Sequence, residues 1–314
     1  MPRRKNVLSA KNDVTLFRIG LWNVWFEKDL LAQWTDSLEE RLFLFTQKNT
    51  LPPDLSVKNT PSQFAASSID HLFDIPHIDE TDYGNIKMRI YAGDKKEHLI
   101  TIQNNKNEIL FALSVESGWQ TTTILSAPSP VGRRYCYEVL GYVLQNFALS
   151  KGGLIFHGVL MDYQGYGIIL SAPSGTGKST HAHLWRDHGY AGIINGDKAL
   201  CRNIDGVWTG FGIPWCGSSS ESENRQVPLA AIVVLEQSDV NSVQRLNPLD
   251  ALTHLLPNIH APKWETTLYN KALDRLDELI PEVPIYLLRC RPDVDAMMTL
   301  KQEMDRLPDQ DDKA

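Results

Sequence analysis

Apolar residues recur in short alternating runs before residue 150. The runs at 86–93, 98–104, 108–115 and 119–126 are separated by turns containing Gly, Asn or Lys. Alternation with period two is typical of strands with one buried face, so these runs predict an antiparallel meander.

Three further segments complete the first half of the chain. Residues 29–45 carry apolar residues at helical spacing with acids near the start, which predicts a helix. Residues 49–82 are rich in Pro, Ser, Asn and Asp and predict an extended or loop-like connection. Residues 133–149 form an amphipathic pattern that "SKGG" ends, because glycine favours a helix C-terminus.

The pattern changes after "SKGG". Strand-like runs now alternate with helical patterns, and the order strand, loop, helix, strand is the one that a mononucleotide-binding α/β core needs. We therefore predict a smaller α+β domain over 1–150 and an α/β domain over 151–314. The predicted strands are 154–161, 166–172, 191–195, 206–212, 230–237 and 283–290, and the predicted helices are 178–188, 248–256 and 265–281.

Composition narrows the class of protein. The 314 residues are 42% apolar and 22% charged, which is ordinary for a globular chain. The net charge of −7 disfavours a nucleic-acid partner. The four cysteines form no CxxC pair, the basic start lacks the apolar stretch of a signal peptide, and no run is long enough to span a membrane. We expect a reduced, cytoplasmic protein that does not interact with membranes.

The strongest local signal is "APSGTGKS", residues 172–179, between a predicted strand and a predicted helix. Small residues let the backbone approach a ligand closely, and the helix adds the positive end of its dipole. The sequence predicts a phosphate-binding loop. Its expected nucleotide-binding residues are Ser174, Gly175, Thr176, Gly177, Lys178, Ser179 and Thr180.

Two side chains of this loop have expected roles of their own. Lys178 would neutralise the terminal phosphates, and the hydroxyl of Ser179 would bind a magnesium ion that spans them. Ala172 stands where such loops usually begin with glycine, a position that needs a small side chain. The alternative is a glycine-rich turn with a surface lysine and no ligand.

Three more residues are candidates for catalysis. His157 lies on the strand before the loop, but a strand histidine is often only a hydrogen-bonded core group. Asp197 ends a predicted strand, where a carboxylate can orient magnesium or merely cap a turn. Arg225 would clamp a transferring phosphate, unless it pairs in solvent with a neighbouring acid.

Other residues with chemical potential are interpreted as structural. His181 and His183 point to different faces of one helix, so they are poor candidates for a shared metal. The tryptophans 208 and 215 are expected in the core. No cysteine is assigned a role.

Taken in order, these motifs resemble the catalytic domain of HPr serine kinase/phosphorylase. The segment "FHGVLMDYQGYGIILSAPSGTGKS" matches its His-Gly strand, glycine turn, strand and loop, a core that phosphoenolpyruvate carboxykinase shares. The segment 188–217 resembles its strand ending in an acid, followed by a hairpin. The segment 212–237 is similar to a loop and strand of compact kinases found beside peptide-modification genes, including lasso-peptide kinases.

The resemblance covers roughly residues 151–304 and implies a fold: a P-loop, mixed-sheet core like that of HPr kinase and phosphoenolpyruvate carboxykinase. The family usually carries two adjacent carboxylates where this chain has only Asp197, between Gly196 and Lys198. The register is ambiguous by one residue, so Asp197 keeps either the metal-binding or the proton-accepting role. We prefer metal binding, with Ser179 as the second ligand. HPr kinases are typically oligomeric, so a homo-oligomer is also expected.

The implied activity is a magnesium-dependent transfer of phosphate from ATP to a hydroxyl. The acceptor would be a serine of a protein or peptide, or a small-molecule alcohol, with Lys178, His157, Asp197 and Arg225 as catalytic residues. The segment of HPr kinases that contacts HPr is not recognisable, which puts HPr itself in doubt. An inactive ATP-responsive binding protein is the alternative, and a carboxykinase ranks third because it would need a second metal site and further arginines.

Overall fold

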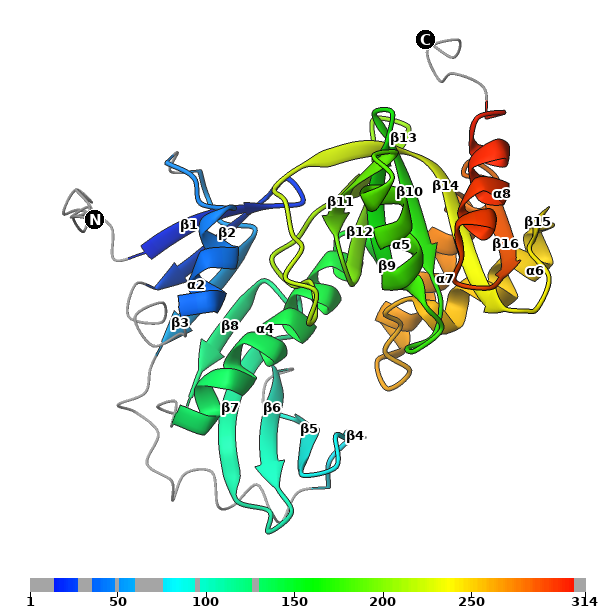
Figure 1. Ribbon diagram of the computed structural model, residues 1–314. Helices are drawn as coiled ribbons and strands as arrows, with labels where there is room; N and C mark the ends of the chain where they lie inside the picture. The colour runs from blue at the N-terminus through cyan, green and yellow to red at the C-terminus, as the bar shows by residue number, and fades with distance from the viewer. Residues whose placement is uncertain are drawn as a thin grey trace. The chain divides into compact units, whose positions relative to one another are not determined.

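The computed structural model describes residues 14–27, 36–48, 51–59, 76–93, 97–125 and 130–307 (Figure 1). The chain divides into two compact units, Met1–Arg18 with Trp22–Tyr137 and Ile19–Leu21 with Glu138–Ala314. The division falls within helix α4 (Pro130–Ser150), whereas the sequence pattern placed a border after this helix. The described residues form two eight-stranded mixed sheets, in agreement with the predicted α/β class.

The first unit is built on one sheet of order β1-β2-β3-β8-β7-β6-β5-β4. Strands β5 to β8 pair with antiparallel neighbours, which confirms the predicted meander. Strand β3 pairs in parallel with both β2 and β8. The strands are β1 (Val14–Ile19), β2 (Trp22–Glu27), β3 (Leu55–Asn59), β4 (Asp79–Asp82), β5 (Ile86–Ala92), β6 (Glu97–Asn104), β7 (Ile109–Glu116) and β8 (Thr121–Ile124).

Two predictions for this unit are only partly met. The helix expected over 29–45 is present as α2 (Asp36–Phe43), and residues 28–35 lie outside the described ranges. The connection expected over 49–82 contains strands β3 and β4, while residues 60–75 are not described. Strand β3 was missed because it buries only Leu55 and Val57, an alternation too short to stand out.

A satisfied polar network crosses strands β4, β5 and β6. The buried amide of Gln103 donates to the Tyr91 hydroxyl at 2.9 Å and to Thr101 Oγ1 at 3.0 Å, and it accepts from Arg89 at 2.7 Å. Arg89 also donates to Glu80 at 2.6 Å. Hydrogen bonds from Lys87 and Arg89 lower the pKa of Glu80 to about 2.

The second unit has a main sheet of order β11-β9-β10-β14-β16-β15, and the hairpin β12–β13 joins the starts of β9 and β14. Strands β10, β14 and β16 are parallel, so their carboxyl ends meet at one edge. The strands are β9 (Leu154–Tyr163), β10 (Tyr166–Ser171), β11 (Ala191–Asn195), β12 (Lys198–Ile204), β13 (Val207–Phe211), β14 (Gln226–Gln237), β15 (Ser242–Arg245) and β16 (Ile285–Cys290).

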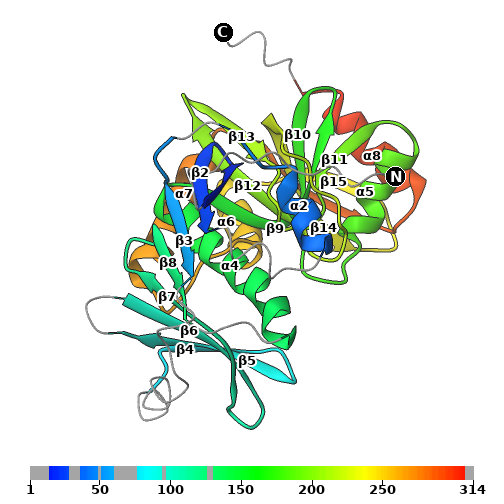
Figure 2. The ribbon, with the colours of Figure 1, turned by 90° about the vertical axis from the view of Figure 1, so that its left-hand side faces the viewer.

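Helices cover both faces of this sheet. Helices α5 (Lys178–Asp187) and α8 (Val294–Met304) lie on one face, and α6 (Pro248–Leu255), α7 (Thr266–Leu279) and the second half of α4 lie on the other (Figure 2). The short 3-10 helix η3 (Leu256–Asn258) follows α6. All strands and helices predicted after residue 150 are present. Strand β12 was expected only as part of the hairpin that the resemblance implied, and β15 and α8 were missed.

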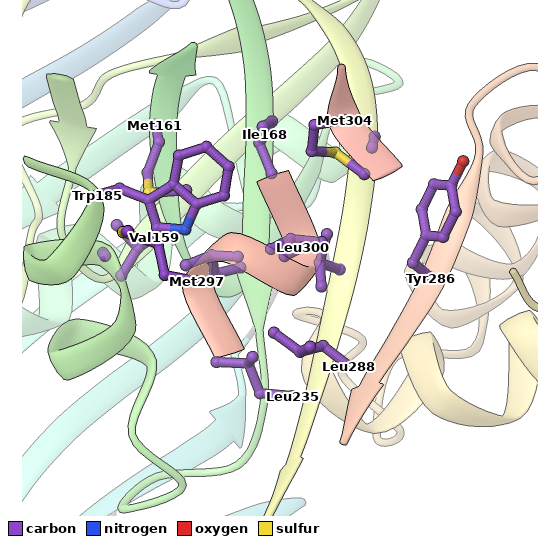
Figure 3. Close-up of a cluster of buried hydrophobic side chains, with 14 of the residues drawn as sticks. Val159, Met161, Ile168, Trp185, Leu235, Tyr286, Leu288, Met297, Leu300 and Met304 are labelled. Atoms are coloured by element: carbon purple, nitrogen blue, oxygen red, sulfur yellow. The ribbon is translucent and has the colours of Figure 1, made fainter. Parts of the chain in front are cut away.

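The face beneath α5 and α8 holds a hydrophobic core (Figure 3). Trp185 of α5 and Met297 and Leu300 of α8 pack against alternate residues of the strands, among them Val159 and Leu288. Because alternate strand residues point to opposite faces, burial on both faces produces the nearly continuous apolar runs of β10 and β14. This core fixes α5, and with it the loop at the start of α5.

None of the helices in the described ranges has the length and hydropathy that a membrane span requires.

Candidate active site

The segment between β10 and α5 has the predicted order of strand, loop and helix. Gly175 and Gly177 adopt φ values of +80° and +110°, and a Cβ added to either would meet nothing within 4 Å. Glycine is therefore needed for the left-handed backbone, and space beside it stays open. Within the described residues, the backbone amides of Gly175, Gly177, Lys178 and Ser179 donate no hydrogen bond. Amides turned outward at the start of a helix form an anion-binding nest.

Lys178 begins helix α5 and is almost completely buried. Its ammonium group donates to the carbonyl oxygens of Ala172 at 2.6 Å and Pro173 at 3.1 Å. Burial lowers the pKa of Lys178, and the negative charge of Asp197 opposes this effect. A buried cation therefore sits at the centre of the loop, close enough to Asp197 to feel its charge.

His157 and Gly158 mark the place where β9 changes partners. Residues up to His157 pair with β12, and residues from Gly158 onward pair with β10. A Cβ on Gly158 would come within 2.7 Å of the Leu170 carbonyl oxygen, so only glycine permits this close pairing. The His-Gly pair thus has a physical reason, and it brings His157 to the end of β10 where the loop begins.

Asp197 lies in a break between two strands that follow the same edge of β9. Strand β11 ends at Asn195 and β12 begins at Lys198. The buried Asn195 side chain accepts hydrogen bonds from the amides of Asp197 at 3.0 Å and Lys198 at 2.8 Å, and the Asp197 carbonyl accepts from Gly158 at 2.9 Å. The backbone carrying Asp197 is held from both sides.

The structure brings His157 and Asp197 together. Their closest atoms, His157 Nε2 and Asp197 Oδ1, are 3.4 Å apart. Burial raises the pKa of Asp197, but the hydrogen bond from His157 and the charges of Lys198 and Lys178 outweigh it, so the net pKa falls below its usual value. Asp197 is an ionised carboxylate at neutral pH, which suits a residue that binds a cation or orients a histidine.

A second charged group, which the sequence did not predict, ties helix α5 to the Asp197 turn. The Glu221 carboxylate lies 3.2 Å from His183 Nε2 and 2.6 Å from Arg186 Nη1, both on α5. The Glu221 carbonyl accepts from the Gly196 amide at 3.0 Å. His183 and Arg186 share a helix face at spacing i, i+3, but their partner is set by a tertiary contact that no local pattern shows.

Arg225 lies apart from these residues. It pairs with Asp162 at 2.8 Å and with Glu223 at 3.3 Å. Asp162 is opposite Gly167, whereas the loop follows Ser171, a separation of about 13 Å along β10 at the usual strand rise. The structure therefore does not bring Arg225 to the loop, and its arrangement is the carboxylate pairing given above as the alternative.

The remaining loop residues face solvent. Ser174, Ser179 and Thr180 are exposed, and Thr176 donates its hydroxyl hydrogen to the Pro173 carbonyl at 2.9 Å. The described residues contain no group of three or more His, Cys, Asp or Glu side chains that could hold a metal ion. A magnesium ion here would depend on phosphate oxygens together with Ser179 and Asp197, and magnesium commonly binds in this way.

Apart from His183, which is partly exposed and contacts Glu221, the residues interpreted as structural are buried. Trp208 and Trp215 lie in the core, and the four cysteines are buried and free. His181 is also buried, and neither of its ring nitrogens has a hydrogen-bond partner within the described residues.

Comparison with known proteins adds little to this geometry. No family model and no curated protein sequence matches the chain. Among solved structures, the chain is similar to an HPr(Ser) kinase/phosphatase from Coxiella burnetii at 11% identity and a TM-score of 0.29. The match covers 48% of this chain and 95% of that one. A likeness of this size does not transfer an activity, so the function must be inferred from the residues.

Proposed function

We propose that the chain is a magnesium-dependent phosphotransferase that moves the terminal phosphate of ATP to a hydroxyl group. A serine of a protein or peptide is the preferred acceptor. The observation that carries the proposal is the meeting of a phosphate-type loop with a histidine–carboxylate pair: Lys178 lies within electrostatic reach of Asp197, which contacts His157.

The loop would hold the triphosphate. The amides of Gly175, Gly177 and Lys178 supply donors for phosphate oxygens, and the start of α5 supplies a partial positive charge. The Lys178 ammonium would exchange the carbonyls of Ala172 and Pro173 for phosphate oxygens, a stronger charge-assisted interaction.

Magnesium would be held by the Ser179 hydroxyl and the Asp197 carboxylate. When bound there, magnesium would neutralise charge on the transferring phosphate. The lowered pKa of Asp197 keeps this carboxylate ionised, as a ligand must be.

His157 is the proposed proton acceptor. With the proton of its neutral ring on Nε2, directed at Asp197, its Nδ1 is free to accept the hydroxyl proton. The acceptor oxygen forms a bond to the terminal phosphorus while the bond to the bridging oxygen breaks, and ADP leaves with that electron pair. Asp197 stabilises the resulting imidazolium, as a carboxylate does in other His-carboxylate pairs.

The test is transfer of labelled phosphate from ATP to a degenerate peptide library with a central serine. The same library with alanine in that position is the control. We expect labelling of the serine library, its loss in Lys178→Ala, and its retention in Lys263→Ala, an exposed lysine away from the loop. Labelling that survives Lys178→Ala would rule out the mechanism. Label transfer to small alcohols alone would move the acceptor class to small molecules.

A binding protein without catalysis is a second candidate, because the site has a single carboxylate, Asp197, in contact with His157. The nearby Glu221 is already engaged by His183 and Arg186 and does not supply the second carboxylate. An ATP-binding protein without transfer would show saturable ATP binding and no ADP formation in a single-turnover assay with either library.

A further inference from the structure

A pocket of about 620 Å³ opens beside the loop. One wall is the loop itself, residues 173–176, and a second is the carboxyl end of β14, residues 234–237. The third wall comes from α6 and η3, through Thr253, His254 and Asn258. This volume is in the range of small-molecule sites, and the carboxyl ends of parallel strands are where α/β sheets bind ligands.

The pocket and the catalytic residues lie on different sides of β10. Strand β10 is flanked by β9, which carries His157, and by β14, which forms the pocket wall. His157 on β9 lies 3.4 Å from Asp197, so the end of a bound phosphate chain that reacts belongs on the β9 side. The other end of the ligand then emerges on the β14 side, at the pocket.

The walls suit a flat ring with a polar edge. Val234 and Leu287, which are paired across β14 and β16 and are not part of the core under α5 and α8, supply apolar surface, and Pro257 lies at the exposed rim. The buried Asn258 side chain donates through Nδ2 to the His254 carbonyl at 2.9 Å. Its side-chain oxygen, Oδ1, accepts no hydrogen bond from the described residues. A buried amide whose oxygen is free to accept can form a hydrogen bond with the amino group of a nucleobase.

The pocket is coupled to the loop by Gln237. Its side-chain amide donates to the Thr176 carbonyl at 3.4 Å, a long contact that joins the end of β14 to the loop. A ligand in the pocket would therefore contact Gln237, which also contacts the loop that carries the phosphate-binding amides.

We propose that this pocket binds the nucleoside of the nucleoside triphosphate, with the phosphates running along the loop towards Asp197. This inference rests on the proposed function, because it requires the loop to hold a triphosphate. It places the nucleoside of the phosphate donor on the β14 side of the loop and the phosphate acceptor on the β9 side. It also makes a nucleotide a better ligand than an inorganic polyphosphate.

The experiment compares binding of Mg-ATP and of magnesium tripolyphosphate, which has the phosphates and no nucleoside. Thr253→Trp would fill the pocket from the exposed face of α6, and Leu249→Trp, one turn earlier and outside the pocket, is the matched control. We expect Thr253→Trp to weaken ATP binding about tenfold or more and to leave tripolyphosphate binding unchanged. Leu249→Trp should change neither affinity.

The possible failures are distinguishable. If the natural chain binds ATP and tripolyphosphate equally well, or if Thr253→Trp binds ATP as the natural chain does, the nucleoside is not in this pocket and the phosphate loop still stands. If the natural chain binds neither ligand, the proposed function fails and the pocket assignment fails with it. Thermal unfolding of both tryptophan variants checks that each is folded.

Discussion

The two sides of the loop differ in how they are built. On the β9 side, charged groups meet through short polar contacts, His157 with Asp197 and Glu221 with α5. On the β14 side, a mixed apolar and amide-lined pocket forms where strand ends meet α6 and η3. We infer that the two sides have different roles. The β9 side would stabilise charge and accept the proton during phosphate transfer, and the β14 side would bind the nucleoside.

The largest effect should come from the residue that serves both sides. Lys178→Ala removes the buried cation at the centre of the loop, so transfer should fall about 10³-fold, which corresponds to about 4 kcal/mol of transition-state stabilisation. Single-turnover phosphate transfer measures this loss, with Lys263→Ala as the control. A reduction below about tenfold would show that the loop does not act on the transferring phosphate.

Asp197→Asn should separate the two sides. The amide keeps the shape but loses the charge that orients His157 and that would bind magnesium, so transfer should fall about 10²-fold while the affinity for metal-free ATP stays within a few-fold. The measurement is the turnover rate together with the affinity for metal-free ATP by equilibrium titration. Equal losses of binding and turnover would contradict the different roles of the two sides.

Glu221→Gln should have a smaller effect of the same kind. It weakens two ion pairs that hold α5 to the Gly196 and Asp197 turn, and half-exposed pairs contribute little energy each. We expect kcat to fall about three- to tenfold with KM for ATP nearly unchanged, because Glu221 positions Asp197 rather than the nucleotide. Glu303→Gln, which breaks the pair between Glu303 of α8 and Arg306 just after the helix, is the matched control. A change in KM alone would refute the positioning role.

Substitution of His181 should change neither phosphate transfer nor ATP binding, but it should change how stability depends on pH. Burial lowers its pKa to about 4, and the charge of Asp293 opposes this only in part. The folded state excludes a proton that the unfolded chain binds below about pH 6.5, so stability is complete above that pH and is lost as the pH falls towards 4. The loss should approach about 3 kcal/mol.

The check is the free energy of unfolding against pH for the natural chain and for His181→Leu. The variant should keep ATP affinity and lose part of the acid sensitivity, with a remainder from His260, whose pKa burial lowers to about 3. An unchanged pH profile would show that His181 is not the buried proton-excluding group.

The charged side was largely predictable from the sequence, because its residues lie in short segments with local signatures. The loop and Asp197 each follow a recognisable strand, His157 lies within β9, and the pairing of β9 with β10 and β11 brings the three together. Glu221 was missed since its position depends on the bridge between Asn195 and Ser222. Arg225 was expected to clamp a transferring phosphate, but it directly precedes β14, whose register with β10 places it at the other end of β10, where it pairs with Asp162.

The pocket was not predictable by the same reasoning. Its walls come from segments near residues 173, 234, 253 and 287, which meet only through the parallel pairing of β10, β14 and β16. Helix α8 was missed although it carries a signal: Asp293 caps it, and Ala296, Met297, Leu300 and Met304 follow at helical spacing. Strand β15 is short and mostly exposed, so its pattern gives no such signal.

The most direct test observes the loop amides themselves. The chain contains two Thr-Gly pairs, Thr176-Gly177 in the loop and Thr209-Gly210 in strand β13. Labelling threonine carbonyl carbons and glycine nitrogens therefore gives two selected amide signals, one of which is an internal control. On addition of magnesium tripolyphosphate, the Gly177 amide should shift strongly downfield and saturate, while the buried Gly210 amide stays in place. A Gly177 signal that does not move at any concentration would contradict the claim that this loop grips phosphate.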